Sequence, residues 1–259
     1  MPTLIHLSDL HFGPGFVSHL GDLILKDIQA LHPDAIVFSG DFTMRARHNE
    51  YQAAREYLNK ITRPTLTIPG NHDQPFFSPV ERLVSPFARY QKYICADTST
   101  ALSAGGFFVA GLNDNRRILP GGFWSSGQRA WLSEQLSGAP RGAVRVVATH
   151  HQLMWEGKTR PAGFWYPSRA LAFLARQGVE IVLNGHTHVP SAVQSPEGIV
   201  VARAGTATSS RTRHGHSNAY NLITVEEKQI SVFVRQYDER SDAFVAVRAY
   251  TFPRHSHEG

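Results

Sequence analysis

Short apolar runs alternate with helical patterns in the first part of the chain. Apolar residues at Leu4–Ser8, Ala35–Ser39 and Thr65–Ile68 predict three buried strands. Between them, apolar positions spaced by three and four residues predict two helices, from Val17 to Leu31 and from Tyr51 to Ile61. This strand–helix–strand order predicts parallel strands joined by right-handed crossovers.

The second part of the chain is less regular and ends in strands. Further strands are predicted at Phe107–Gly111, Val144–Thr149 and Val179–Asn184, with helices at Gly127–Leu136 and Ser168–Gln177. After Gly198 strand follows strand, at Val200–Ala202, Tyr220–Val225, Ile230–Tyr237 and Ala243–Tyr250. We expect these late strands to form an antiparallel second sheet packed on the first. The expected fold class is α/β, a sandwich of sheets and helices in a single domain spanning residues 1–259.

Composition excludes several classes of protein. With 42% hydrophobic and 18% charged residues, the chain is neither disordered nor of low complexity. No apolar run approaches the roughly 20 residues of a membrane span, so no membrane partner is expected. Cys95 is the only cysteine, which excludes an intramolecular disulfide. No basic segment precedes the first apolar run, so we expect no signal peptide and a cytoplasmic location.

Charge and histidine content point to an anionic ligand and a polar site. The net charge of +5 is spread along the chain rather than gathered in basic runs. It suits a small anionic substrate, and stable nucleic-acid binding is not expected. The 14 histidines are more than double the number that an average usage of roughly 2% would give. Several lie beside Asp, Asn and Gly, which is where we expect the function to reside.

Five polar clusters each follow a predicted strand. They are Asp9-Leu10-His11, Gly40-Asp41, Gly70-Asn71-His72-Asp73, His150-His151 and Gly185-His186-Thr187-His188. In open α/β sheets, ligands bind outside the carboxyl ends of the strands, so these side chains should meet at one rim. The preceding glycines should let the backbone turn sharply where the strands stop.

The residue types predict a pair of metal ions. Imidazole, carboxylate and amide oxygen suit Mn, Fe, Zn or Co, and the thiolates of a structural zinc site are missing. Eight donors exceed what one ion needs, so two ions bridged by one carboxylate are expected. Two divalent ions less Asp9, Asp41 and a bridging hydroxide leave a charge of about +1, which suits a phosphodiester anion.

The ordered clusters resemble the calcineurin-like metallophosphoesterase superfamily over nearly the whole chain. The resemblance implies that fold, two mixed β-sheets flanked by helices. It also implies two divalent ions (Mn2+, Fe2+/Fe3+ or Zn2+). The first would bind Asp9, His11, Asp41 and His188. The second would bind Asp41 as the bridge, Asn71, His150 and His186.

The resemblance also implies catalytic roles. Asn71 would hold a non-bridging phosphoryl oxygen, and His72 would serve as general acid or charge stabiliser at the leaving group. Asp73 would fix local geometry. His150 is preferred over His151 as a ligand because family members use the first of such a pair and neighbouring strand residues face opposite ways.

The nearest branch is that of the bacterial class III cyclic-nucleotide phosphodiesterases. The segments that carry this similarity are Leu7–Gly13, Ala204–Arg211 and Asn218–Val225. They imply a phosphodiesterase in which a metal-bridging hydroxide attacks phosphorus in line. The substrate would be a small phosphodiester anion, with 3',5'-cyclic nucleotides such as cAMP as one class.

Three other functions stay open on the same fold: a DNA exonuclease or repair nuclease, a lipid A-pathway pyrophosphohydrolase and a non-catalytic scaffold. The nuclease would need a continuous basic face, and the pyrophosphohydrolase would need an apolar helical insertion. The scaffold would bind protein through its aromatic stretches. A fourth function, protein phosphatase activity, is disfavoured by the continuation after Gly40-Asp41.

Further residues could contact the substrate or a partner. Asn113 follows a strand and could reach the phosphate, although a turn residue is favoured two to one. Arg211 could hold a phosphate or a base, with a solvated loop equally favoured. Two irregular segments, 115–125 and 152–167, could form lids that stack on a nucleobase, or a homo-oligomer interface. Their aromatic residues are Phe123, Trp124, Trp155, Phe164, Trp165 and Tyr166.

Overall fold

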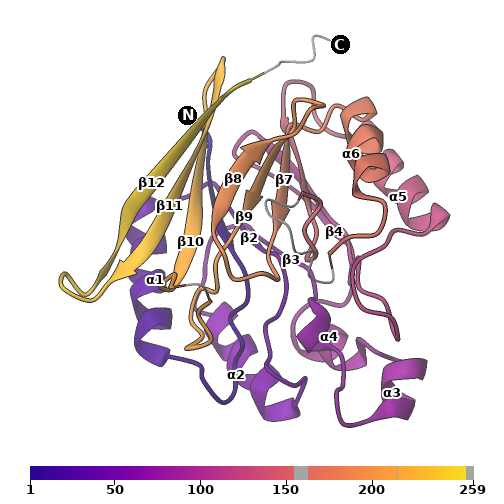
Figure 1. Cartoon of the computed structure of the whole chain (residues 1–259), viewed down its shortest axis with the longest axis vertical. Coiled ribbons are helices and arrows are strands. Elements are labelled where there is room, and N and C mark those ends of the chain that lie inside the picture. Colours follow the sequence, from indigo (N-terminus) through magenta and orange to yellow (C-terminus); the bar gives the residue numbers. More distant parts are fainter. Residues whose placement is uncertain (155–162, 214, 255–259) are drawn as a thin grey trace.

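The computed structural model describes residues 1–154, 163–213 and 215–254 and contains two stacked six-stranded sheets (Figure 1). The first sheet has the order β12-β11-β10-β1-β2-β3 and the second the order β4-β5-β6-β7-β9-β8. Both sheets mix parallel and antiparallel pairs, which confirms the predicted α/β sandwich of two mixed sheets.

The first sheet joins the two ends of the chain. Its parallel part is β1 (Thr3–Leu7), β2 (Ala35–Phe38) and β3 (Thr65–Thr67). Its antiparallel part is β10 (Ala219–Val225), β11 (Gln229–Asp238) and β12 (Ala243–Pro253). The two parts meet where β10 pairs with β1, Leu4 lying opposite Ile223.

The predicted antiparallel second sheet is therefore wrong. The strands β10–β12 extend the first sheet because β1 offers a second edge whose main-chain groups need partners. The second sheet consists of β4 (Thr100–Ala104), β5 (Phe107–Gly111), β6 (Val144–Ala148), β7 (Ile181–Asn184), β8 (Ser191–Gln194) and β9 (Val200–Arg203). The strand β9 runs parallel to β7, and the edge strands β4 and β8 were not predicted.

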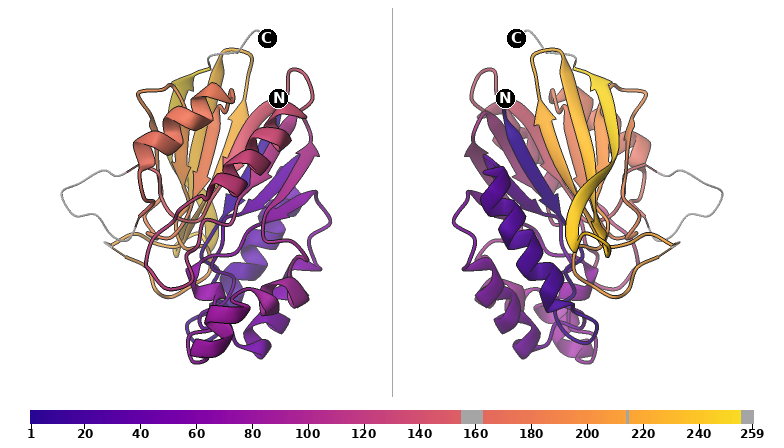
Figure 2. Two further views of the ribbon diagram at one scale, coloured as in Figure 1. Left: turned by 90° about the vertical axis from the view of Figure 1, so that its right-hand side faces the viewer. Right: turned by 90° about the vertical axis from the view of Figure 1, so that its left-hand side faces the viewer.

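Helices cover the outer faces of the sandwich (Figure 2). Against the first sheet pack α1 (Ser18–Leu31), α2 (His48–Leu58) and α4 (Ala88–Tyr93). Against the second pack α5 (Ser126–Ser137) and α6 (Pro167–Arg176). The short α3 (Pro79–Val84) buries none of its residues, and neither α3 nor α4 was predicted.

A layer of apolar side chains between the sheets fixes their relative position. Val37 and Leu66 of the first sheet and Val109, Val146 and Leu183 of the second belong to one buried cluster. Because both sheets contribute to one core, the carboxyl ends of β1, β2, β6 and β7 are held in a fixed relation. Among the described residues, no helix is both long and apolar enough to cross a bilayer.

Candidate metal centre

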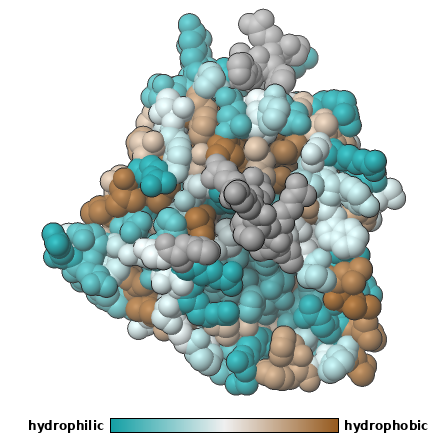
Figure 3. Space-filling model, viewed as in Figure 1, coloured by the Kyte–Doolittle hydropathy of each residue, from teal (hydrophilic) through white to brown (hydrophobic). Residues whose placement is uncertain are grey.

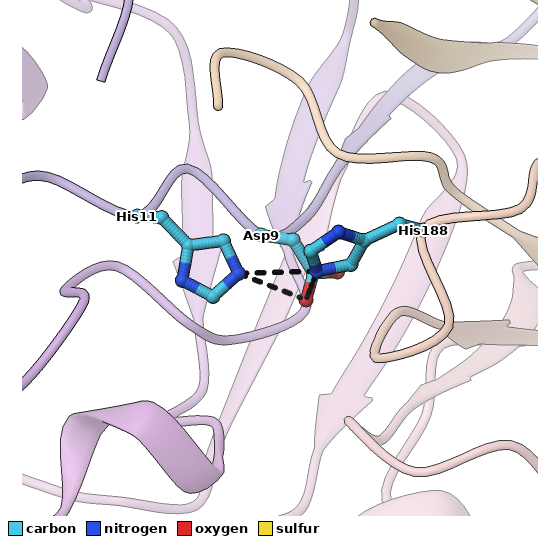
Figure 4. A group of neighbouring side chains, drawn as sticks. All are labelled: Asp9, His11 and His188. Carbon is cyan, nitrogen blue, oxygen red and sulfur yellow. Dashed lines mark hydrogen bonds and ion pairs between the residues drawn. The ribbon is translucent and has the colours of Figure 1, made fainter. Parts of the chain in front are cut away.

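The turns that follow β1 and β7 bring one carboxylate and two imidazoles together (Figure 4). Asp9 Oδ1 lies 3.2 Å from His188 Nε2 and 3.7 Å from His11 Nε2. The two Nε2 atoms are 3.1 Å apart. All three side chains are buried, so they form a closed group of potential ligands.

A second group lies beside the first and is built from the turns after β2, β3, β6 and β7. Asp41 Oδ2 lies 3.4 Å from His150 Nε2, and Asp9 joins these two as potential ligands. Asn71 Oδ1 lies 3.0 Å from His150 Nε2 and 2.9 Å from His186 Nδ1. Five segments that are distant in sequence thus meet at one place.

Asp41 lies between the two groups. Its Oδ2 atom is 3.4 Å from His150 Nε2 of the second group and 3.8 Å from His11 Nε2 of the first. Its other oxygen, Oδ1, accepts a hydrogen bond of 2.8 Å from the backbone N–H of His72. The carboxylate is therefore oriented so that one oxygen faces both groups.

Backbone carbonyls fix the tautomers of the imidazoles. The Nδ1 atoms of His11, His150 and His188 contact the carbonyl oxygens of Thr43, Ser39 and Arg211, at 3.3, 2.8 and 2.8 Å. A carbonyl only accepts, so each Nδ1 carries the hydrogen and each neutral ring presents its Nε2 lone pair to the centre.

This arrangement fits divalent cations. Two neutral imidazoles whose lone pairs face each other at 3.1 Å repel unless a proton or a cation lies between them. Nitrogen ligands of one tetrahedral ion, each at about 2.0–2.1 Å, lie roughly 3.3 Å apart. In addition, when the hydrogen of the neutral His188 ring is on Nδ1, the buried Asp9 Oδ1 has no hydrogen-bond donor. An ion would satisfy this oxygen and both nitrogens at once.

The pKa shifts of the histidines also favour metal binding at the centre. Burial alone would lower the pKa of His150, but the Asp41 carboxylate outweighs it and raises the pKa to about 10. Against the same effect of burial, Asp9 raises the pKa of His188. Burial lowers the pKa of His11 to about 4 and that of His186 to about 3. Without an ion the centre balances its carboxylates with protons, which a metal ion would displace.

The backbone is strained at these residues. Among the described residues nine non-glycine residues have a positive φ, and five of them belong to the centre: Asp9, His11, Asp41, His186 and His188. Each such conformation costs free energy and persists only where the surrounding structure enforces it. The concentration of strain at this rim favours it as the candidate functional site.

The neighbouring glycines contribute in two different ways. Gly40 has a φ of +103°, as the predicted sharp turn requires. Gly70 has an ordinary negative φ, which differs from the prediction. It is needed for close approach, because a Cβ there would collide with Asp41 Oδ1.

A cavity of about 810 Å³ opens on the centre. Asn71 and His72 line it, together with Arg211, Pro14, Met44, Arg45, Gln74, Phe76, Phe77 and Arg82. The Met44 carbonyl lies 2.8 Å from His72 Nδ1 and fixes the ring. Nε2 is therefore the ring atom of His72 that is left for a ligand in the cavity.

The remaining predicted residues fall into different environments. His151 lies behind the second group, its ring 4.6 Å from that of His186, and its Nδ1 atom is 3.2 Å from Oδ2 of the buried Asp114. Asn113 Oδ1 accepts hydrogen bonds from the backbone and the side chain of Asn115, as a turn residue does. Substrate binding by Asn113 thus stays a prediction that its turn contacts disfavour.

The aromatic segments do not line this cavity. Trp124 and Phe164 are buried and pack edge to face at 4.8 Å in the core under α5 and α6. Phe123, Trp165 and Tyr166 are exposed and line a separate cavity of about 630 Å³. Residues 155–162, including Trp155, lie outside the described part of the chain, so the predicted lids stay untested.

Sequence reasoning did not predict the hydrogen bonds of two buried acidic residues beside the candidate ligands, Asp73 and Asp114. Asp73 accepts hydrogen bonds from the backbone N–H groups of Phe42, Thr43 and Gly70, which ties two ligand-bearing turns together. Asp114 accepts from the backbone N–H groups of His150 and His151. The one available signal was position, since both follow strands on the same rim.

Comparison with known proteins identifies the family of the chain. The family model described as calcineurin-like phosphoesterase matches residues 2–190. The chain is 29% identical over 202 residues to the glycerophosphodiester phosphodiesterase GpdQ of Enterobacter lignolyticus, covering 71% of this chain and 70% of that protein. It is 25% identical over 173 residues to a probable cyclic nucleotide phosphodiesterase of Synechococcus sp., covering 64% and 62% of the two chains.

The fold also matches solved structures. Purple acid phosphatase PPD1 of yellow lupin superposes with a TM-score of 0.70 at 14% identity. The match covers 98% of this chain and 54% of the lupin chain. At this identity the likeness concerns the fold alone.

Proposed function

Because the chain belongs to the calcineurin-like phosphoesterase family, we propose that it is a phosphodiesterase that works with two divalent metal ions. The observation that carries the proposal is the set of buried Nε2 atoms and carboxylate oxygens that face one another at short distances. Relatives named as phosphodiesterases support the choice of a phosphodiester as substrate.

The geometry supports one division of the ligands. Asp9, His11 and His188 would hold the first ion, and Asn71, His150 and His186 the second. Asp41, which faces both groups, would bridge them. Mn2+, Fe2+/Fe3+ or Zn2+ suits this mixture of imidazole, carboxylate and amide oxygen.

When bound, the two ions would polarise the phosphoryl oxygens and activate a water molecule as nucleophile. The protein would bind and orient the substrate. Asn71 lies at the mouth of the centre, where its side chain can position the phosphoryl group. The Met44 carbonyl takes the Nδ1–H of His72, so His72 would act as an imidazolium that directs Nε2–H at the leaving oxygen and protonates it or stabilises its charge.

The substrate proposed is a small phosphodiester anion that enters the cavity beside Arg211. Cyclic nucleotides such as cAMP and glycerophosphodiesters are the first classes to test, since relatives are named for them. A cytoplasmic location and assembly as a homo-oligomer remain predictions from the sequence.

Two measurements on the purified protein test the proposal. Metal analysis should find two ions per chain, and the manganese-loaded protein should hydrolyse bis(p-nitrophenyl) phosphate. A competition series of cyclic nucleotides, linear diesters, monoesters and phospholipid head groups then ranks the substrates. A protein with neither metal nor turnover would instead be a scaffold on this fold.

A further inference from the structure

The wall of the cavity beyond the metal centre is strongly basic. Three arginines, Arg45, Arg82 and Arg211, line it, and no described lining residue is acidic. The arginines come from three separate segments, the turn after β2, the helix α3 and the loop before β10. Together they place three positive charges around a space that already contains the proposed reaction centre.

These charges have no carboxylate partners among the described residues. Arg82 donates to the Arg117 carbonyl at 2.8 Å, and Arg211 contacts the Met44 sulfur at 3.1 Å. Elsewhere arginines form ion pairs, for example Arg235 with Asp27 and Arg254 with Glu180. Guanidinium groups left unpaired around a cavity favour an anionic ligand.

The same wall carries an apolar platform. Phe76 and Phe77 are 70% and 61% exposed, although both line the cavity. The guanidinium groups of Arg45 and Arg47 lie 5.4 and 5.8 Å from the centre of the Phe77 ring. Figure 3 shows hydrophobic surface (brown) at the lower right of the molecule, the side on which α3 lies in Figure 1. Exposed aromatic rings flanked by arginines are typical of surfaces that stack nucleobases.

We propose that this wall, formed by Arg45, Arg82, Arg211, Phe76 and Phe77, binds a second anionic group and an aromatic base of the substrate. The preferred substrate is then a linear dinucleotide with a terminal phosphate. The inference rests on the proposed phosphodiesterase function and deepens it. A cyclic mononucleotide or a glycerophosphodiester with a neutral alcohol carries one negative charge, which the metal centre already accommodates.

The reaction on such a substrate is a simple hydrolysis. One water adds its oxygen to phosphorus, and the bond from phosphorus to the 3'-oxygen breaks. A proton goes to that 3'-oxygen. Thymidine dinucleotide with a 5'-phosphate, pTpT, then gives two molecules of thymidine 5'-phosphate, and no further reactant is needed.

The test compares two substrates that differ by one phosphate, pTpT and TpT. With the manganese-loaded protein, kcat/KM for pTpT should exceed that for TpT by about tenfold or more, the effect of about one charge-assisted hydrogen bond. In Arg45→Gln and Arg82→Gln this ratio should fall several-fold toward one. Arg240→Gln, an exposed arginine in the β11–β12 turn, is the matched control and should keep the wild-type ratio.

The outcomes separate this inference from the proposed function. Turnover of bis(p-nitrophenyl) phosphate with equal kcat/KM for pTpT and TpT overturns the inference and leaves the phosphodiesterase standing. A wild-type preference that both arginine variants retain also overturns it. No turnover of any of the three diesters overturns the proposed function and this inference with it.

Discussion

At the residue scale, three imidazole rings of the centre are oriented through Nδ1, the ring nitrogen that does not face the centre. The Thr43, Ser39 and Arg211 carbonyls hold the Nδ1 atoms of His11, His150 and His188, which leaves every Nε2 directed inward. Such outer contacts set the tautomer and the direction of a metal-binding imidazole. The proposed ligand set therefore depends on main-chain atoms as much as on residue identity.

The bridging position of Asp41 is open to a direct test. Asp41→Ala removes the oxygen that faces both groups, so both ions should be lost together. Metal analysis of the purified variant should find about none of the two ions per chain. Full retention of one ion would contradict the bridge.

His72 should act on the reaction and not on metal binding. His72→Ala should lower kcat by about 10²–10⁴-fold, the usual contribution of a general acid, while both ions stay bound. His19→Ala, at an exposed position paired with Asp242, is the control and should keep full activity. Loss of metal from the His72 variant would show that its assigned role is wrong.

At the scale of elements, the turns after the strands matter more than the strands themselves. The turns after β2 and β3 are joined by Asp73, which accepts three backbone N–H groups, and Thr43 adds a hydroxyl contact at 3.0 Å. Burial raises the pKa of Asp73 to about 6, and the neighbouring Asp41 adds to this, against the backbone donors. The three donors hold two ligand-bearing turns in register.

Removing the Asp73 carboxylate, which joins the turns after β2 and β3, should destabilise the fold. Asp73→Ala leaves three buried N–H groups unpaired, at about 1–3 kcal/mol each, so the free energy of unfolding should fall by about 3 kcal/mol or more. Urea unfolding of the metal-free protein measures the change. Glu227→Ala, an exposed carboxylate in the β10–β11 turn, should change it by less than about 1 kcal/mol. Equal free energies of unfolding for the two variants would show that Asp73 does not hold the two turns together.

The whole molecule should be stabilised by metal, and more so at higher pH. A free metal concentration of 100 Kd adds about 2.7 kcal/mol to the free energy of unfolding, and a chelator should reverse it. The carboxylates raise the pKa of His150 to about 10, so the metal-free protein holds a proton there at neutral pH, and Asp9 also raises the pKa of His188. A metal ion must displace such protons, so affinity should rise with pH between about 6.5 and 10.

Thermal unfolding at fixed manganese concentration measures this dependence. The increase in Tm caused by metal should grow from pH 6.5 upward and shrink below it. Isothermal titration in buffers of different ionisation enthalpy should register proton release on binding. An increase in Tm that is independent of pH would show that His150 and His188 hold no displaceable protons.

Sequence alone determined the residue types of the centre and the strands that carry them. The apolar runs around β1, β2, β6 and β7 and the polar residues that follow them are local patterns with a fixed period, so they could be identified before any contact was known. The preference for His150 over His151 as a ligand rested on family usage and strand parity, and it stays a prediction.

Tertiary structure alone decided how these pieces meet. The placement of β10 beside β1, the left-handed backbone of Asp9 and Asp41, and the contacts of Asp73 and Asp114 all depend on partners far away in the sequence. Local periodicity carries no information about which free strand edge a later strand will join, or which carbonyl will meet an imidazole. Those choices follow from packing two sheets on one core, which only the folded chain can resolve.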